Sequence, residues 1–157
     1  MNYTESDKSR FWAKVDKSGE CWPWTASRKP NGYGQFMVWP KLRYAHRVAY
    51  EMAVGPVPAK TDLDHTCHDR ACVNPSHLRL TTRKQNLENH SGAPKNNTSG
   101  VRGVTWHKQH SKWHARVGHC GRTYNAGLFD SIAEAEAAVI AKRNELFTHN
   151  DLDRVAA

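Results

Sequence analysis

The sequence predicts an α+β protein made of two small domains joined by a linker. Its 157 residues suit one mid-sized domain or two small ones. Residues 91–98 are small, polar and rich in turn formers, which is typical of a linker. The chain changes character there: residues 1–90 hold three of the four cysteines, whereas residues 99–148 show three strand patterns and then a helix. We expect residues 149–157 to form a C-terminal tail.

The overall composition favours a nucleic-acid partner and excludes a membrane protein. The chain has 23 basic and 15 acidic residues, a net charge of +8. A basic protein of this kind points first to nucleic acid, although a merely soluble basic domain is the alternative. No apolar run approaches the roughly 20 residues of a membrane span. The polar N-terminus shows no secretory signal, so we expect a cytoplasmic protein.

The first domain is expected to be short strands and helices around an irregular centre. Its predicted elements are strands near 35–39 and 43–45, and helices near 47–54 and 81–89. Residues 64–80 are crowded with Cys, His, Asn and Pro, so no long element is expected there.

The second domain is expected to be a three-stranded sheet backed by one helix. Strands are predicted at 101–106, 112–117 and 122–128, separated by polar turns. Ser131 and Glu134 have the spacing of a capping box, and an Ala-rich helix should follow to about Phe147.

Charge is divided unevenly within this second domain. Residues 95–125 contain six basic residues and no acid, whereas residues 126–157 contain three basic residues and six acids. A sheet that faces DNA and a helix that faces solvent would produce this division. A protein-binding sheet is the alternative, and acids also favour the first turn of a helix.

The densest chemistry in the chain is a cysteine and histidine cluster. Cys67, Cys72 and His77 are five residues apart, and structural zinc usually takes four such ligands. Cys21 is the natural fourth ligand, because Cys120 lies beyond the linker and is expected to be a free thiol. The alternative is four unrelated thiols and a core histidine, but a small, loop-rich domain needs a stabilising ion.

Three further polar residues suggest hydrolysis of a phosphodiester. A zinc-bound loop would hold His65 rigidly without using it as a ligand. Asp64 and Asn86 offer hard oxygen donors of the kind that Mg²⁺ accepts. A histidine base beside such a cation could activate water while the cation neutralises charge on the phosphate.

At these residues the sequence resembles the HNH, or ββα-metal, nucleases, and especially their zinc-containing His–Cys box branch. The matching pattern is His65-x-Cys67-x4-Cys72-x-Asn74-Pro75-x-His77, with Asn86 at the expected distance. The resemblance covers about residues 10–90. It implies that His65 is the general base and that Asn86 and Asp64 hold the catalytic cation. It also implies that Cys67, Cys72 and His77 bind zinc.

Segments upstream of this motif resemble small phage-type HNH endonucleases. They are Cys21-Trp-Pro-Trp24, Asn31-Gly-Tyr-Gly34 and His46-Arg47, and they support Cys21 as the fourth zinc ligand. Related enzymes place an arginine near the scissile phosphate. Arg47 is the first candidate for that role, followed by Arg43 and Arg28. A phage-encoded or homing endonuclease is the setting this resemblance implies.

The second domain resembles the AP2 DNA-binding domain. The resemblance covers about residues 97–148 and rests on Ser99-Gly-Val-Arg-Gly-Val104, Lys112-Trp113-x-Ala115-Arg-Val117 and Gly127-Leu-Phe-Asp-Ser131. It implies a sheet that lies in the major groove of duplex DNA. Arg102 matches the family's first DNA-contacting arginine. Thr105, Trp106 and Asn125 depart from the plant-type pattern, so base preference cannot be carried over.

Strand alternation adds candidate contacts on the face of the sheet opposite the helix. Together with exposed basic residues, the expected DNA-binding set is Arg102, Lys108, His114, Arg116, Arg122, Thr123 and Asn125.

We therefore interpret the chain as a DNA endonuclease whose first domain cuts and whose second domain docks. Mg²⁺ or another divalent cation is expected in catalysis and Zn²⁺ in the structure. The alternatives are a non-catalytic DNA-binding regulator with a zinc scaffold, and an RNA-binding zinc protein. A monomer and a homodimer both remain open.

Overall fold

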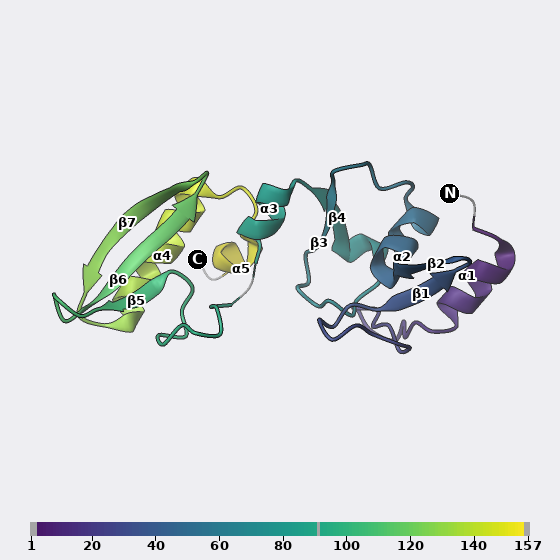
Figure 1. Ribbon diagram of the computed structural model, residues 1–157, viewed down its shortest axis with the longest axis horizontal. Coiled ribbons are helices and arrows are strands. Elements are labelled where there is room, and N and C mark those ends of the chain that lie inside the picture. Colours follow the sequence, from purple (N-terminus) through teal and green to yellow (C-terminus); the bar gives the residue numbers. More distant parts are fainter. Residues whose placement is uncertain (1–2, 91, 156–157) are drawn as a thin grey trace. The chain divides into compact units, whose positions relative to one another are not determined.

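The structure, a computed structural model, describes residues 3–90 and 92–155 and separates the chain into two compact units. The units are Met1–Asn86 and Leu87–Ala157, and each has its own hydrophobic core (Figure 1). The chain is a mixed α+β protein. Within the described ranges, no helix is long and apolar enough to cross a membrane.

The first unit is built from two β-hairpins and short helices. Its elements in order are α1 (Glu5–Trp12), β1 (Gln35–Val38), β2 (Lys41–Tyr44), α2 (Ala45–Ala53), β3 (Asp62–His65), the 3₁₀ helix η1 (Pro75–His77), β4 (Leu78–Thr81) and α3 (Arg83–Glu88). β1 pairs with β2 and β3 with β4, both antiparallel. Aromatic rings dominate the core, where Phe11 contacts Trp24 and Phe36 at centroid distances of 5.0 and 5.1 Å.

Two features of the first unit differ from the sequence-based expectation. The segment 64–80 contains no long element, as expected, but its two ends belong to the β3–β4 hairpin, which was not predicted and whose strands are four residues each. The strands are joined by a long connection and contain polar residues, so they lack the alternation of apolar and polar residues that predicts a hairpin. Helix α1 was also not predicted, although Thr4 and Asp7 form a capping box at its start.

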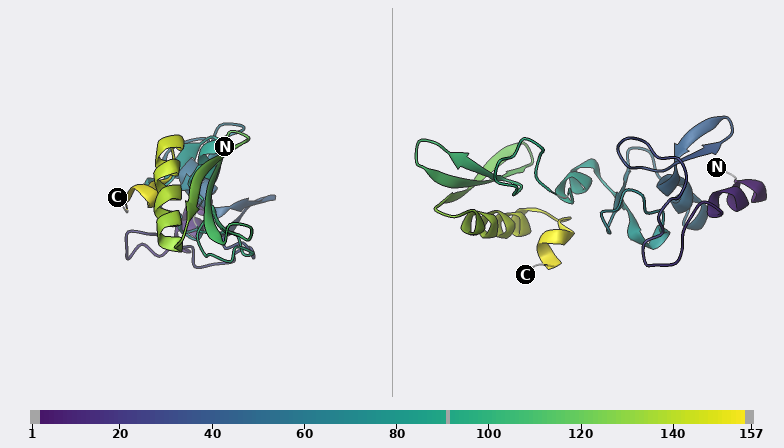
Figure 2. Two further views of the ribbon diagram at one scale, coloured as in Figure 1. Left: turned by 90° about the vertical axis from the view of Figure 1, so that its left-hand side faces the viewer. Right: turned by 90° about the horizontal axis from the view of Figure 1, so that it is seen from below.

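The second unit confirms the predicted sheet and helix. Its elements are β5 (Val104–His107), β6 (Lys112–His119), β7 (Arg122–Phe129), α4 (Ile132–Leu146) and α5 (Asp151–Val155). The strands form an antiparallel sheet in the order β5-β6-β7, and α4 packs on one face of it (Figure 2). Ser131 and Glu134 form the expected capping box. The buried residues between the layers are Val104, Ala115, Val117, Ala135, Val139 and Phe147.

The segments on both sides of this fold are hydrogen bonded to it. The Asn97 amide donates to the carbonyls of Val101 and Val104 at 3.1 and 3.0 Å. At the other end, Asp153 in α5 accepts from the buried guanidinium of Arg143 at 2.6 Å. Asn97 lies in the range expected to be a linker, and Asp153 in the range expected to be a tail.

Gly103 gives a test of how tightly the start of the sheet is packed. Its φ is +90°, and a Cβ added there would lie 2.6 Å from the carbonyl oxygen of Arg116. We expect Gly103→Ala to lower the free energy of unfolding by on the order of 1–3 kcal/mol, since strain and a backbone clash add. Gly118→Ala is the control, because its Cβ would meet nothing within 4 Å. Equal denaturation curves for the two variants would contradict this packing.

Candidate active site and metal centre

Three cysteines and one histidine meet in the first unit. The ligand atoms of Cys21, Cys67, Cys72 and His77 all lie within 4.8 Å of one another. The Nδ1 atom of His77 is 3.6 Å from the Sγ of Cys21 and 3.7 Å from the Sγ of Cys72. Tetrahedral zinc with ordinary bond lengths places sulfur and nitrogen ligands about 3.6 Å apart. The cluster therefore has the composition and the spacing of a structural zinc site.

The backbone around the cluster holds the ligands in place. The amides of Trp22 and Asn74 each donate to the Sγ of Cys72 at 3.4 Å. The Asn74 side chain accepts from the amide of Ser76 at 3.0 Å, which starts the η1 turn that carries His77. The Asn74 amide group also donates to the Glu20 carbonyl, next to Cys21, at 2.7 Å.

The part-buried thiols of Cys67 and Cys21 ionise less readily than a thiol in water. Burial raises the pKa of Cys67 to about 12 and also raises the pKa of Cys21. Zinc binds the thiolate and not the thiol, so a bound ion would supply the charge that stabilises the deprotonated form. Cys120 is exposed in the second unit and does not belong to the cluster.

His65 is held in one orientation by the backbone of the same cysteine loop. It ends strand β3, is 5% exposed, and its Nε2 lies 3.0 Å from the carbonyl oxygen of Cys72. Only a protonated Nε2 can donate to a carbonyl, so this contact selects the tautomer with its lone pair on Nδ1. Burial lowers the pKa of His65, partly offset by the bond to Cys72 and the charge of Asp64. The ring is therefore neutral near pH 7.

A cavity of about 220 Å³ lies beside this histidine. Its lining consists of Tyr33, Tyr44, His46, Arg47, Asp62, Leu63, Arg83 and Asn86. The His65 ring packs against two lining rings, with centroids 5.0 Å from His46 and 5.9 Å from Tyr33. Burial lowers the pKa of His46 to about 3, helped by the neighbouring His65 and Arg47. His46 is therefore a neutral wall of the cavity.

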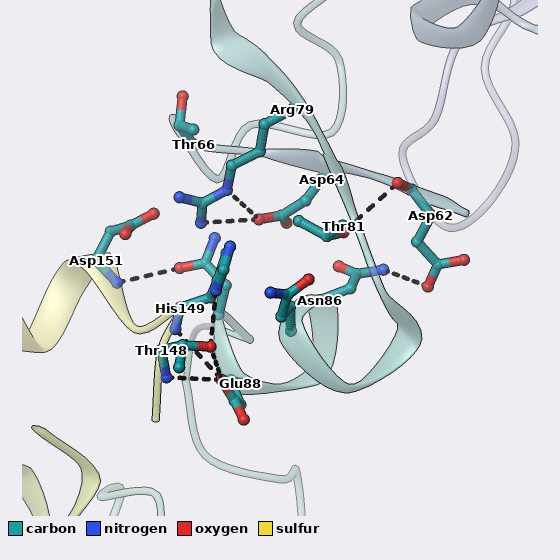
Figure 3. Close-up of polar contacts among 12 residues, drawn as sticks. Asp62, Asp64, Thr66, Arg79, Thr81, Asn86, Glu88, Thr148, His149 and Asp151 are labelled. Atoms are coloured by element: carbon teal, nitrogen blue, oxygen red, sulfur yellow. Dashed lines mark hydrogen bonds and ion pairs between the residues drawn. The ribbon is translucent and has the colours of Figure 1, made fainter. Parts of the chain in front are cut away.

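Side-chain oxygen atoms that could bind a cation lie close together where β3, β4 and α3 meet (Figure 3). The Asn86 amide donates to Oδ2 of Asp62 at 2.9 Å. Asp64 instead accepts from Nη2 and Nε of Arg79 at 3.0 and 3.2 Å. Asp62 and Asp64 are two residues apart on β3, so their side chains share one face of the strand. The expected pair was Asp64 with Asn86, and Asp62 was missed, although the alternation of Asp62 and Asp64 could have revealed it.

Of the three arginines considered for phosphate contact, Arg47 lines the cavity. Arg43 is engaged elsewhere, because it forms an ion pair with Glu51 at 2.6 Å and donates to the hydroxyl of Tyr3. The Nε of Arg28 donates to the carbonyl of Trp24 at 2.9 Å.

In the second unit, four of the expected DNA contacts lie on the face of the sheet opposite α4. The register pairs Arg116 with Asn125, and the ring of His114 lies 3.2 Å from Oδ1 of Asn125. Thr123 pairs with Gly118 on the same face. Arg116, Thr123 and Asn125 are exposed, and Lys108 is exposed in the turn between β5 and β6.

The other two expected contacts lie elsewhere. Arg102 donates from its guanidinium to the carbonyls of Leu87, Glu88 and His90, where α3 ends. These bonds use its donors on the backbone, and so Arg102 does not project freely from the sheet as expected. Arg122 pairs with His119, whose ring contacts Phe147 of the core, so alternation places Arg122 on the helix side.

Comparison with known families finds a match within the first unit. The family model of HNH endonucleases matches residues 43–88, the segment that holds β2 to α3 and three of the four zinc-type ligands. Residues 43–88 are therefore similar to an HNH endonuclease domain, which suggests a nuclease or DNA-binding role for this segment. No solved structure matches the chain.

Three curated relatives come from Escherichia phage T7. Protein 7.7 is 41% identical over 69 residues, which cover 44% of this chain and 53% of that protein. Protein 2.8 is 38% identical over 77 residues, which cover 46% of this chain and 50% of that protein. The chain thus spans about half the length of these two. Protein 3.8 is 32% identical over 114 residues, covering 73% of this chain and 90% of that protein, so the chain belongs to the Protein 3.8 family.

The metal centre can be tested by removing one ligand at a time. Elemental analysis should find one zinc ion per chain, and Cys72→Ser should lose it and unfold the first unit, because binding energy there is largely folding energy. Cys120→Ser is the matched control and should keep the metal and the stability. Purified chain without zinc, or loss of zinc from Cys120→Ser alone, would contradict the assignment.

Proposed function

We propose that this protein is an endonuclease that hydrolyses phosphodiester bonds in duplex DNA. The observation that carries the proposal is the fixed orientation of His65. The carbonyl of Cys72, a residue of the zinc-type cluster, accepts from its Nε2 at 3.0 Å. The same loop that would bind the structural ion thus presents Nδ1 as a base of defined position. The match of the HNH family to residues 43–88 supports the same activity.

Two residues of the first unit have separate roles in the proposed reaction. His65 takes a proton on Nδ1 from the attacking water, which becomes the nucleophile at phosphorus. Arg47, on the cavity wall, binds a phosphate oxygen. A divalent cation such as Mg²⁺, when bound, would neutralise charge on a nonbridging oxygen and on the leaving 3′ oxygen.

The donor set fits a hard cation. The side-chain amide nitrogen of Asn86 donates to Asp62, which leaves the side-chain oxygen of Asn86 to bind a cation. Asp64 lies on the same strand face and supplies a carboxylate held by Arg79. Asn86 and Asp64 would hold the cation through their side-chain oxygens, and the bond to Asp62 fixes the orientation of the Asn86 amide.

The second unit docks the enzyme on DNA through its AP2-like sheet. Its open face presents Arg116, His114, Asn125 and Thr123, with Lys108 in the adjoining turn. Cationic side chains there would contact phosphates, and amide or imidazole groups could reach base edges. Because the curated relatives are phage proteins, we place the enzyme in a phage-encoded role in the host cytoplasm, acting on DNA there.

His65→Ala tests the catalytic assignment. The variant should keep its zinc content and its DNA affinity but lose cleavage of plasmid DNA by about 10²–10⁴-fold, the usual contribution of a general base. The exposed His90 gives the control variant His90→Ala, which should cleave at the normal rate. Undiminished cleavage by His65→Ala would remove it from the mechanism.

A pair of arginine variants tests the docking face. Arg116→Ala should weaken binding to duplex DNA and lower the log–log salt slope by about one, since each neutralised phosphate releases counterion. Arg122→Ala removes the same charge from the helix side and should have a smaller effect on both quantities. Fluorescence anisotropy of labelled duplex at several salt concentrations measures both. A larger loss of DNA affinity in Arg122→Ala than in Arg116→Ala would contradict the assignment of DNA binding to the face opposite α4.

A further inference from the structure

The β1–β2 hairpin exposes apolar side chains that the first unit's own fold does not use. Its turn presents Trp39, which is 84% exposed, and the strands beside it present Met37 and Leu42 at 42% and 55%. Figure 2 shows this hairpin projecting from the first unit. Bulky apolar groups clustered at a projecting tip are uncommon on a protein surface and mark a contact with another molecule.

The exposed side chains continue the face that reaches the cavity. Met37 is opposite Leu42 in the register, and Gln35 is opposite Tyr44. Alternation places these two pairs on the same face of the hairpin. Tyr44 lines the cavity beside His65. One strand face therefore runs from the candidate catalytic cavity to the tip that carries Trp39.

The charge around the hairpin is positive. Residues 21–50 contain five Lys and Arg residues and no Asp or Glu. Lys41 is exposed next to the turn, and a groove of about 460 Å³ beside Met37 and Leu42 is also lined by Arg10 and Lys14.

Two acids, Asp7 and Glu51, are paired with basic residues of this region. Asp7 lies 3.6 Å from Arg10, and Glu51 forms its ion pair with Arg43. The net field at the tip is therefore that of Lys41, Lys14 and the neighbouring basic residues. This field suits a polyanion with apolar surface, and stacked bases between phosphates have both properties.

We propose that the β1–β2 hairpin is a second DNA contact in which Trp39 inserts as a wedge against a base step of the cleaved duplex. Apolar wedges flanked by cations unstack and kink DNA in this way from the minor groove. Lys41 and Lys14 hold the flanking phosphates, and the kink presents one phosphate to the cavity along the Tyr44 face. A second copy of this chain fits less well, because a symmetric contact would bring the same cations together. This inference rests on the proposed action on DNA.

The experiment uses the full chain with His65→Gln, so that DNA is bound without being cut. Trp39→Ala in this background should weaken binding to duplex DNA about tenfold, the scale of losing one stacked base contact. Trp39→Phe should restore most of the affinity. Val54→Ala, at another exposed apolar residue of the first unit, is the control and should bind normally. Zinc content and circular dichroism establish that each variant is folded.

A duplex containing 2-aminopurine reports the insertion directly. Its fluorescence should rise when the Trp39 protein binds, because the base is unstacked, and should stay low with Trp39→Ala. Equal affinity and equal fluorescence for both proteins, with the parent chain cleaving DNA, would overturn the wedge and leave the nuclease intact. Failure of both proteins to bind DNA, with no cleavage by the parent chain, would overturn the proposed function as well. A change from dimer to monomer on Trp39→Ala, at unchanged DNA affinity, would assign the tip to self-association and overturn the inference.

Discussion

The geometry of the first unit depends on one long-range contact, in which Cys21 lies against the Cys67–His77 loop. Cys21 precedes His77 by 56 residues, yet their ligand atoms lie 3.6 Å apart. This junction closes the segment around the aromatic core, where Trp24 and Val73 are fully or almost fully buried. The Cys72 carbonyl, part of the same loop, then fixes the His65 ring. The arrangement of the candidate zinc ligands, the core packing and the orientation of His65 thus all depend on this closure.

A buried carboxylate has the corresponding role in the second unit. Glu88 ends α3, is 4% exposed, and accepts from the amide and hydroxyl of Thr148 and from the amide of His149 (Figure 3). The guanidinium of Arg102 holds the carbonyls at the same helix end. A buried charge is tolerated only when it is satisfied by such donors.

The sequence was informative where a local pattern determines the structure. The three strands, their turns and the Ser131–Glu134 capping box all follow from short-range periodicity and were predicted correctly. The cysteine spacing likewise indicated a four-ligand set, which the structure brings together. The hydrogen bonds of Arg102 were not predictable, because its partners are backbone carbonyls at the end of another element. The pairing of Asn86 with Asp62 depends on the register of β3 and α3, which side-chain identity alone does not reveal.

Each unit contains a segment that is basic and free of acids. Residues 21–50 and 95–125 are both basic and free of acids, and each surrounds a hairpin or sheet with an open face. Three acids are paired with arginines at largely buried positions: Asp64 with Arg79, Glu51 with Arg43 and Asp153 with Arg143. Other acids, such as Glu5 and Asp130, are exposed. The positive charge of residues 21–50 and 95–125 is therefore not offset by acids within those segments. Such segments suit the proposed action on DNA, because attraction to phosphates acts before any base is read.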